Sequence, residues 1–272
     1  MLYRMHKPSP PLAPFVRVIW YHEGEPKPHA KERLLPDGSV ELVVNLFENR
    51  IPMYGSDGDP TAEIFPGSIV CGPRSRYFVI DTASQEKCIG VHFRPGGAYA
   101  FLGPSCAELS NHHWSLEDLW GGEARTFRER LLEAPSVDHL FGVVENTLIA
   151  RAGCSIERDP AVNYAVHLIQ QNPHAVTIGN ITGQIGMTAK RFIESFKREV
   201  GLTPKVFCRV RRFQRVIQAV HNARPVDWSS VAMDCGYFDQ AHFIHDFRSF
   251  SGMSPSAYLA RRTEHMNHVP LV

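Results

Sequence analysis

Residues 231–259 read VAMDCGYFDQAHFIHDFRSFSGMSPSAYL, and residues 186–204 read GMTAKRFIESFKREVGLTP. The two stretches align on a pair of phenylalanines four residues apart, which are Phe243 and Phe247 in the later copy. Both copies then close on glycine, any residue, serine or threonine, and proline. The sequence therefore contains the same small unit twice, and this repeat decides the fold of the C-terminal half.

Each copy has the pattern of a helix, a glycine turn and a second helix. The first helices are expected at residues 178–185 and 229–235, each directly before a glycine. Each second helix begins at a capping side chain, carries the phenylalanine pair on one face, and ends at a glycine suited to the left-handed conformation. These capping and terminating residues are Thr188 and Gly201 in the first copy and Asp239 and Gly252 in the second. The pattern indicates a helix-turn-helix, whose second helix can enter the DNA major groove, with a merely packed helix pair as the alternative for either copy alone.

A basic helix is expected between the copies, from about Pro204 to His221. Its basic residues are Lys205, Arg209, Arg211, Arg212 and Arg215. It is long enough to hold two recognition helices about one helical turn of DNA, near 34 Å, apart. From Asp159 onward the chain carries 13 Lys and Arg against 8 Asp and Glu, whereas the whole chain has a net charge of only +1. The asymmetry indicates an acidic partner such as DNA, with ordinary variation in surface charge as the alternative.

Residues from about Pro160 to Tyr258 resemble the double helix-turn-helix domain of the AraC/XylS family of bacterial transcription regulators. The second copy follows the family signature of a G-[YF] turn, a helix with paired phenylalanines and a G-x-[ST]-P-x-x-[YF] close. The first copy matches in FIESFKREVGLTPKVF and departs in its supporting helix, which contains Gly179 and Gly183. Each glycine inside a helix costs roughly 0.5–1 kcal/mol relative to alanine. The resemblance thus implies a DNA-binding domain whose first unit is the less rigid.

The resemblance also implies which side chains face DNA once the phenylalanine pairs are buried. The predicted DNA-binding residues are Ala189, Lys190, Ile193, Glu194 and Lys197 in the first recognition helix and Gln240, Ala241, Ile244, His245 and Arg248 in the second. Gln240 suits a bidentate pair with adenine, and Glu194 can accept from N4 of cytosine. The side chains suited to phosphates, which position without specifying sequence, are Lys197, Arg198 and Arg248. Asp246 would repel phosphate and is placed away from the DNA backbone; a solvated helix face is the alternative for each assigned contact.

The first half of the chain has the pattern of a β-rich domain. Short apolar runs alternate with turns between residues 12 and 103, and the turns are too short for parallel crossovers, which indicates a small barrel or sandwich. The runs lie at residues 15–21, 39–46, 68–72, 77–81 and 88–93. After residue 115 the spacing becomes helical. The apolar faces of the helices within 123–151 either pack on the barrel or form a dimer seam.

The predicted fold class is α+β with two domains. An N-terminal β-barrel, cupin-like domain with flanking helices is expected at residues 1–152, and a C-terminal all-α tandem helix-turn-helix domain at 160–260. Residues 153–159 are the expected linker, and 261–272 a tail without a further strand. The cupin-like barrel is implied by the family resemblance. In this family the DNA-binding domain usually follows a sensing or dimerising domain, which is often a cupin-like β-barrel. Three stretches of the N-terminal half resemble an uncharacterised N-terminal domain that is found fused to AraC-type DNA-binding domains. They are LLPDGSVELVVNL, GVHFRPGGAYAFL and SLEDLWG.

Four polar side chains of the predicted β domain are candidates for a ligand pocket. Glu41 and Asn45 share one face of a strand, because side chains two apart point the same way. His92 and Arg94 share one face of another strand. These residues can line the mouth of a barrel and bind a polar or anionic ligand. The alternatives are an edge-strand charge that discourages aggregation at Glu41 and a solvent-facing pair at His92 and Arg94.

The sequence gives little support for metal or enzyme chemistry. The six cysteines are scattered without a C-x-x-C pair, and the ordered histidine and glutamate spacing of a metal-binding cupin is missing. We therefore expect no metal and no cofactor. An enzyme with an AraC-type DNA-targeting module would need an activated thiolate, and Cys71, Cys88 and Cys106 are too dispersed for one. The N-terminus lacks an apolar stretch long enough for a signal peptide or membrane span, so a cytoplasmic protein is expected.

The favoured function is therefore sequence-specific DNA binding in transcription regulation, without enzymatic activity. Its partners would be double-stranded operator or promoter DNA and a small-molecule effector that shifts the relative placement of the two readers. RNA polymerase is a further partner if the protein is an activator. The main alternative is a ligand-independent regulator whose N-terminal domain only forms a homodimer or binds another protein.

Overall fold

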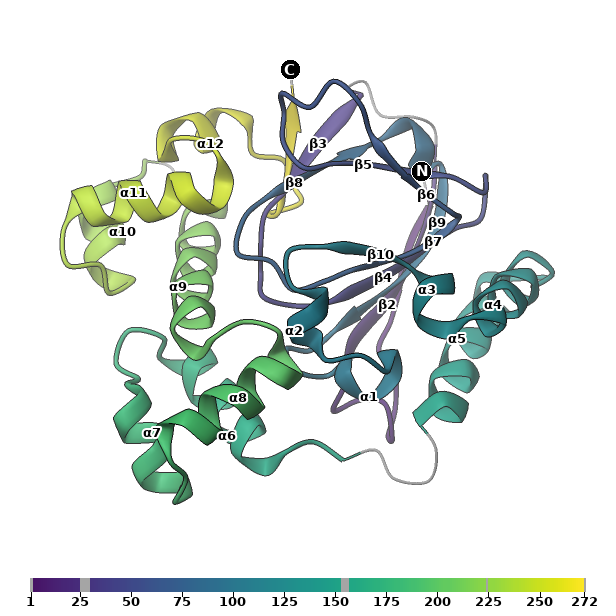
Figure 1. Ribbon diagram of the computed structural model, residues 1–272. Coiled ribbons are helices and arrows are strands. Elements are labelled where there is room, and N and C mark those ends of the chain that lie inside the picture. The colour runs from purple at the N-terminus through teal and green to yellow at the C-terminus, as the bar shows by residue number, and fades with distance from the viewer. Residues whose placement is uncertain (1, 25–29, 153–156, 224, 272) are drawn as a thin grey trace.

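The computed structural model describes residues 2–24, 30–152, 157–223 and 225–271. It shows a central β domain, with a pair of helices on one side and a larger helical domain on the other (Figure 1). The predicted two-domain α+β fold is confirmed. Part of the predicted linker, residues 153–156, lies outside the described residues, so the linker boundaries stay a prediction.

The strands of the described residues form two antiparallel sheets. The six-stranded sheet has the order β1 (Leu2–His6), β2 (Val16–Glu23), β9 (Lys87–Phe93), β4 (Glu41–Asn45), β7 (Ser68–Cys71) and β10 (His113–Ser115). The five-stranded sheet has the order β11 (His268–Leu271), β3 (Lys31–Leu34), β8 (Phe78–Asp81), β5 (Ile51–Tyr54) and β6 (Glu63–Phe65). A small apolar core that includes Ile69, Phe78 and Ile80 lies between them. The predicted apolar runs correspond to β2, β4, β7, β8 and β9.

Five helices of the β domain cover the other face of the six-stranded sheet. They are α1 (Tyr99–Leu102), α2 (Cys106–Leu109), α3 (Leu116–Trp120), α4 (Gly122–Leu132) and α5 (Val137–Ala152), and a 3₁₀ turn lies at Ala83–Gln85. Leu42 and Val44 of β4 belong to this core, whereas Val43 packs between the sheets, as strand alternation requires. Leu131, Leu140 and Leu148 are at most 4% exposed. Of the two alternatives for residues 123–151, packing within the chain is therefore the one that the structure shows.

The C-terminal domain contains the predicted repeat. Its helices are α6 (Pro160–Gln171), α7 (Ile178–Ile185), α8 (Ala189–Val200), α9 (Pro204–His221), α10 (Trp228–Asp234), α11 (Gln240–Ser251) and α12 (Pro255–Arg261). Thr188 accepts a hydrogen bond from the Arg191 N–H at the start of α8, and Asp239 accepts from the His242 N–H at the start of α11. Both helices end at a glycine in the left-handed conformation. Their phenylalanine pairs are fully buried, at 0% exposure.

The C-terminal tail differs from the expectation, because His268–Leu271 form strand β11. This strand pairs with β3 and places Val269 opposite Arg33 in the antiparallel register. The expectation of a tail without a further strand is therefore wrong. Four residues that include Pro270 carry too little strand signal, and a proline is tolerated here because β11 is an edge strand. The C-terminal end of the chain thus returns to the β domain and adds an edge strand to the five-stranded sheet, as Figure 1 shows near the C-terminus.

Phe247→Ala is expected to lower the free energy of unfolding by about 3–5 kcal/mol, since the ring is fully buried against Phe213 and Tyr258. Phe238→Ala is the matched control, because Phe238 is 93% exposed. Its effect should stay within about 0.5 kcal/mol. Denaturant unfolding of the full-length protein, followed by circular dichroism, measures both. Equal losses from the two substitutions would contradict the packing described here.

Candidate nucleic-acid interface

The second helix of each unit presents predicted DNA-binding side chains to solvent. The exposed ones are Ala189, Lys190, Glu194 and Lys197 on α8 and Gln240, Ala241, His245 and Arg248 on α11. The two predicted isoleucines, Ile193 and Ile244, are half-buried and pack against the core of the domain. The exposed members of each set therefore share one helix surface, whereas the isoleucines also serve the core.

The two exposed helix faces differ in charge. On α8 the exposed basic residues are Lys190, Arg191, Lys197 and Arg198, beside one exposed acid, Glu194. On α11 the only exposed Lys or Arg is Arg248, and His245 is the other exposed basic side chain. The first unit therefore offers more positive charge for phosphates, and the second offers a largely neutral surface.

Asp246 lies inside the domain, where it joins α11 to α9. Its carboxylate is 2% exposed, with Oδ1 2.7 Å from Nη2 of Arg209 and Oδ2 3.8 Å from Nη2 of Arg212. The imidazoles of His242 and His245 lie 3.8 and 3.9 Å from the same carboxylate. The placement of Asp246 away from the solvent-exposed face agrees with the prediction. Its partners were not foreseen, because the two arginines lie more than thirty residues earlier in the chain.

The remaining arginines of α9 are also engaged within the protein. Arg211 donates from Nη1 to the carbonyl of Asp37 at 3.3 Å, and Arg215 donates to the carbonyl of Gln171. Lys205 is the exposed basic residue of this helix. Most of the arginines on α9 therefore bind groups within the protein instead of forming a free basic surface.

Glu41 and His92, two of the predicted ligand residues, lie next to each other on paired strands. They are register partners in β4 and β9, with Nδ1 of His92 3.7 Å from Oε1 of Glu41. Nε2 of His92 lies 3.0 Å from Oδ2 of Asp37, and Nε1 of Trp20 donates to Oε1 of Glu41 at 2.8 Å. The structure thus forms a polar cluster in which Asp37 and Trp20 are members that the sequence reasoning missed. Asp37 was missed because it lies in the sequence Pro36-Asp37-Gly38, a pattern that indicates only a turn.

Asn45 and Arg94 do not join this cluster. Asn45 ends β4, is 1% exposed, and its amide donates to the carbonyls of Arg50 and Ser84. It therefore fixes the turn after the strand. Arg94 is exposed and donates from Nε to the carbonyl of Ala13.

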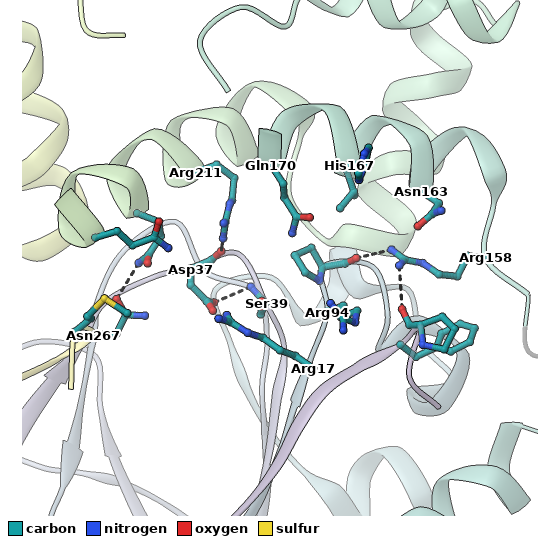
Figure 2. A pocket seen from close by; sticks show the side chains of 17 residues that line it. Arg17, Asp37, Ser39, Arg94, Arg158, Asn163, His167, Gln170, Arg211 and Asn267 are labelled. Carbon is teal, nitrogen blue, oxygen red and sulfur yellow. Dashed lines mark hydrogen bonds between the residues drawn. The ribbon is translucent and has the colours of Figure 1, made fainter. Parts of the chain in front are cut away.

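Arg94 lines a cavity of about 740 Å³ between the β domain and the helices α6 and α9. Figure 2 shows four arginines around it, with Arg158 bound to two backbone carbonyls and Arg211 bound to the Asp37 carbonyl. These arginines are Arg17, Arg94, Arg158 and Arg211, and the carboxylate that lines the cavity is Asp37. The cavity is therefore electropositive and is walled by both domains.

The described cysteines do not offer activated thiolates. Burial raises the pKa of Cys71, Cys88 and Cys106 to about 12, which is the opposite of what a nucleophilic cysteine needs. Within the described ranges, no three histidine, cysteine or acidic side chains are grouped closely enough to hold a metal ion. The helices of those ranges are also too short or too polar to span a membrane.

Two family models match the chain in succession. One is described as a domain of unknown function (DUF6597) and matches residues 4–115; the other is described as a helix-turn-helix domain and matches residues 181–261. The XylDLEGF operon transcriptional activator 1 of Pseudomonas putida is 25% identical over 134 residues, which cover 46% of this chain. The same stretch covers 40% of that protein, so the chain matches less than half the length of this relative.

Two solved structures illustrate which proteins the chain is similar to. A probable AraC family transcriptional regulator from Rhodopseudomonas palustris CGA009 is 28% identical and covers 38% of this chain and 97% of that one, with a TM-score of 0.35. ToxT from Vibrio cholerae covers 95% of this chain and 98% of its own at 12% identity, with a TM-score of 0.46. The chain therefore carries a DUF6597 domain followed by a helix-turn-helix domain, and it is similar to DNA-binding transcription regulators of the AraC family.

Proposed function

We propose that the chain reads two adjacent major-groove segments of a specific operator, and that a small molecule at the β domain controls this reading. The observation that carries the proposal is the pair of exposed and chemically different faces on α8 and α11, joined by the single helix α9. Two copies of one scaffold with different exposed side chains suit two different DNA segments better than a repeated half-site.

The position of the exposed residues within each helix supports base reading. Recognition helices contact base edges mainly through their N-terminal residues. Ala189 and Lys190 open α8, and Gln240 and Ala241 open α11. Lys197 and Arg248 lie in the last turns, where they suit the flanking phosphates.

Contacts between the domains support control of the readers by the β domain. Gln214 of α9 donates from Nε2 to the carbonyl of Pro36 at 2.9 Å, and Arg211 of the same helix donates to Asp37. Strand β11, which follows the second unit, pairs with β3. A ligand that binds one placement of these elements better than another would shift the two readers. RNA polymerase as a partner and a homodimer remain predictions.

Selection of bound DNA from a random library, with the full-length protein at two salt concentrations, tests the proposal. A motif of two blocks about ten base pairs apart is expected. Binding that depends only on salt and enriches no motif would contradict it.

Gln240→Ala is expected to relax the preference at one operator position by about 1–3 kcal/mol, since the bidentate amide contact is lost. Arg248→Ala is the comparison. It should weaken binding to all DNA sequences alike and lower the salt dependence of the binding constant by the amount expected for about one phosphate contact. Quantitative binding to the selected operator and its single-position variants distinguishes the two. Equal losses from Gln240→Ala on operator and scrambled DNA would argue against base reading by this residue.

The contact between Asp37 and His92 predicts a pH dependence of domain stability. Burial lowers the pKa of His92, but the charges and hydrogen bonds of Asp37 and Glu41 outweigh burial and raise it to about 10. Burial alone would raise the pKa of Asp37. The positive charge of His92 outweighs the effect of burial and holds the pKa of Asp37 well below its usual range. Because the folded pKa of His92 exceeds its unfolded value near 6.5, its stabilisation is complete below about pH 6.5 and is lost as pH rises toward 10.

We therefore expect Tm to fall between about pH 6.5 and pH 10 in the native protein, and His92→Gln to flatten this fall. The Asp37 contribution disappears only in acid, as pH drops below the usual aspartate range. His167→Gln serves as the control, since His167 is exposed on α6. Thermal unfolding at several pH values measures the slopes, and identical slopes in all three proteins would contradict the assigned pair.

A further inference from the structure

Arg74 is a buried cation that has no ion-pair partner among the described residues. It lies in the loop between β7 and β8 and is 7% exposed, and its Nε and Nη2 atoms have no hydrogen-bond partner. Burial lowers its pKa to about 10, so the guanidinium stays charged at neutral pH. Among the described residues, no carboxylate lies within ion-pair distance of it. Burying a charge in this way is costly unless an anion accompanies it.

His113 lies beside Arg74 and also lacks partners. Both of its ring nitrogens are buried without a hydrogen bond, and burial together with the Arg74 charge lowers its pKa well below the usual value. The neutral ring therefore offers one donor and one acceptor. Both groups contact the ring of Phe78, with Arg74 Cζ 4.4 Å and the His113 ring 4.8 Å from its centroid.

Arg74 and His113 line a cavity of about 470 Å³, here called the Arg74 cavity. Its other walls are mostly polar and include Ser56, Thr61 and Asn111. Asp59, Glu63 and Arg76 also line it. This volume lies within the range of small-molecule sites. None of the four ligand residues predicted from the sequence is among its lining residues.

We propose that the Arg74 cavity binds a small hydroxylated monocarboxylate, and this inference rests on the proposed ligand control of DNA reading. One unpaired guanidinium calls for one negative charge, and a carboxylate matches its planar fork. Asp59 and Glu63 disfavour a doubly charged ligand such as phosphate. The polar walls can hydrogen-bond hydroxyl groups and offer little to a long apolar chain.

The loop that carries Arg74 contacts both DNA-reading units. Pro73 lies against Gly201, which ends α8, and Tyr77 lies against Gly252, which ends α11. The Tyr77 N–H also donates to the carbonyl of Phe250 at 3.0 Å. Asn111, in the cavity wall, holds the loop by accepting from the Ser75 N–H at 2.9 Å. An anion at Arg74 therefore reaches both recognition helices through one short loop.

Calorimetry and thermal shift on the full-length protein without DNA test the site. The probes are gluconate, galacturonate and lactate at millimolar concentration, with glucitol as the neutral match of gluconate and inorganic phosphate as the dianion. At least one hydroxy acid should bind and raise Tm, and glucitol should not. Arg74→Gln should weaken that binding about tenfold or more, since it removes a charge-assisted pair. Arg50→Gln removes the same charge from an exposed position that does not line the cavity and should change the affinity less than about twofold.

Three outcomes would overturn the inference: no hydroxy acid binds, phosphate binds more tightly than every acid, or both arginine variants weaken binding equally. The charge of Arg74 would have no ligand-binding role if Arg74→Gln were more stable than the native protein and no acid raised the Tm of either protein. Because binding is measured without DNA, failure of the site is separate from failure of operator selection.

The coupling between the Arg74 cavity and DNA binding is tested with Tyr77→Ala. This variant should keep the acid affinity and reduce the effect of the acid on operator affinity. An undiminished effect would overturn the assigned route.

Discussion

Gly201 and Gly252 end the two recognition helices with φ of 82° and 68°, and each lies directly against the β domain. A Cβ on Gly201 would lie 2.3 Å from Cγ of Pro73, and one on Gly252 would lie 2.3 Å from Cε1 of Tyr77. Any other residue would strain the backbone and clash with the neighbouring loop. The glycine that ends α8 or α11 therefore also sets how closely that helix approaches the β domain. These two close approaches let both helix ends pack directly against the loop between β7 and β8.

The distribution of charge follows from the same arrangement. The C-terminal half has a surplus of basic residues, but Arg209 and Arg212 are tied to Asp246, and Arg211 and Arg215 to backbone carbonyls. These pairs join α9 to α11, to the β domain and to α6. A net charge summed over the sequence thus overstates the charge available for phosphates. What remains exposed is concentrated on α8, so the first unit suits electrostatic anchoring and the second suits sequence discrimination.

The helical half was predictable from the sequence because its signals are local. Caps, glycines and phenylalanine pairs stand within one helix length of each other, and the predicted bounds of α7 and α9 match the structure. Strand β3 reads KERL and gave no apolar run, yet Glu32 and Arg33 are buried. Glu32 pairs with His268, which lies 236 residues later. Burial of charge through such distant partners leaves no periodic pattern in either segment.

The candidate sites were predictable to different degrees for the same reason. Exposed positions on a recognition helix follow from where its buried phenylalanines lie, so most of the assigned DNA-binding residues are exposed. In contrast, CGPRSRYF around Arg74 reads as a turn with two solvated arginines. Only the tertiary structure turns one arginine inward, beside His113 from β10, and leaves the other exposed. Pairing of Glu41 with His92 likewise depends on strand register, which the sequence does not specify.

Strand β11 limits how the readers can move relative to the β domain. The helical domain follows the β domain in the chain, and its last residues return to the five-stranded sheet, where His268 lies 2.9 Å from buried Glu32. The domain is therefore held at its C-terminal end as well as through α9 and the loop at Pro73 and Tyr77. A ligand that released the readers entirely would have to break a strand pairing, whereas a small shift of the loop would leave it intact. The proposed control of DNA reading therefore favours small sliding movements at packed surfaces over large domain rotations.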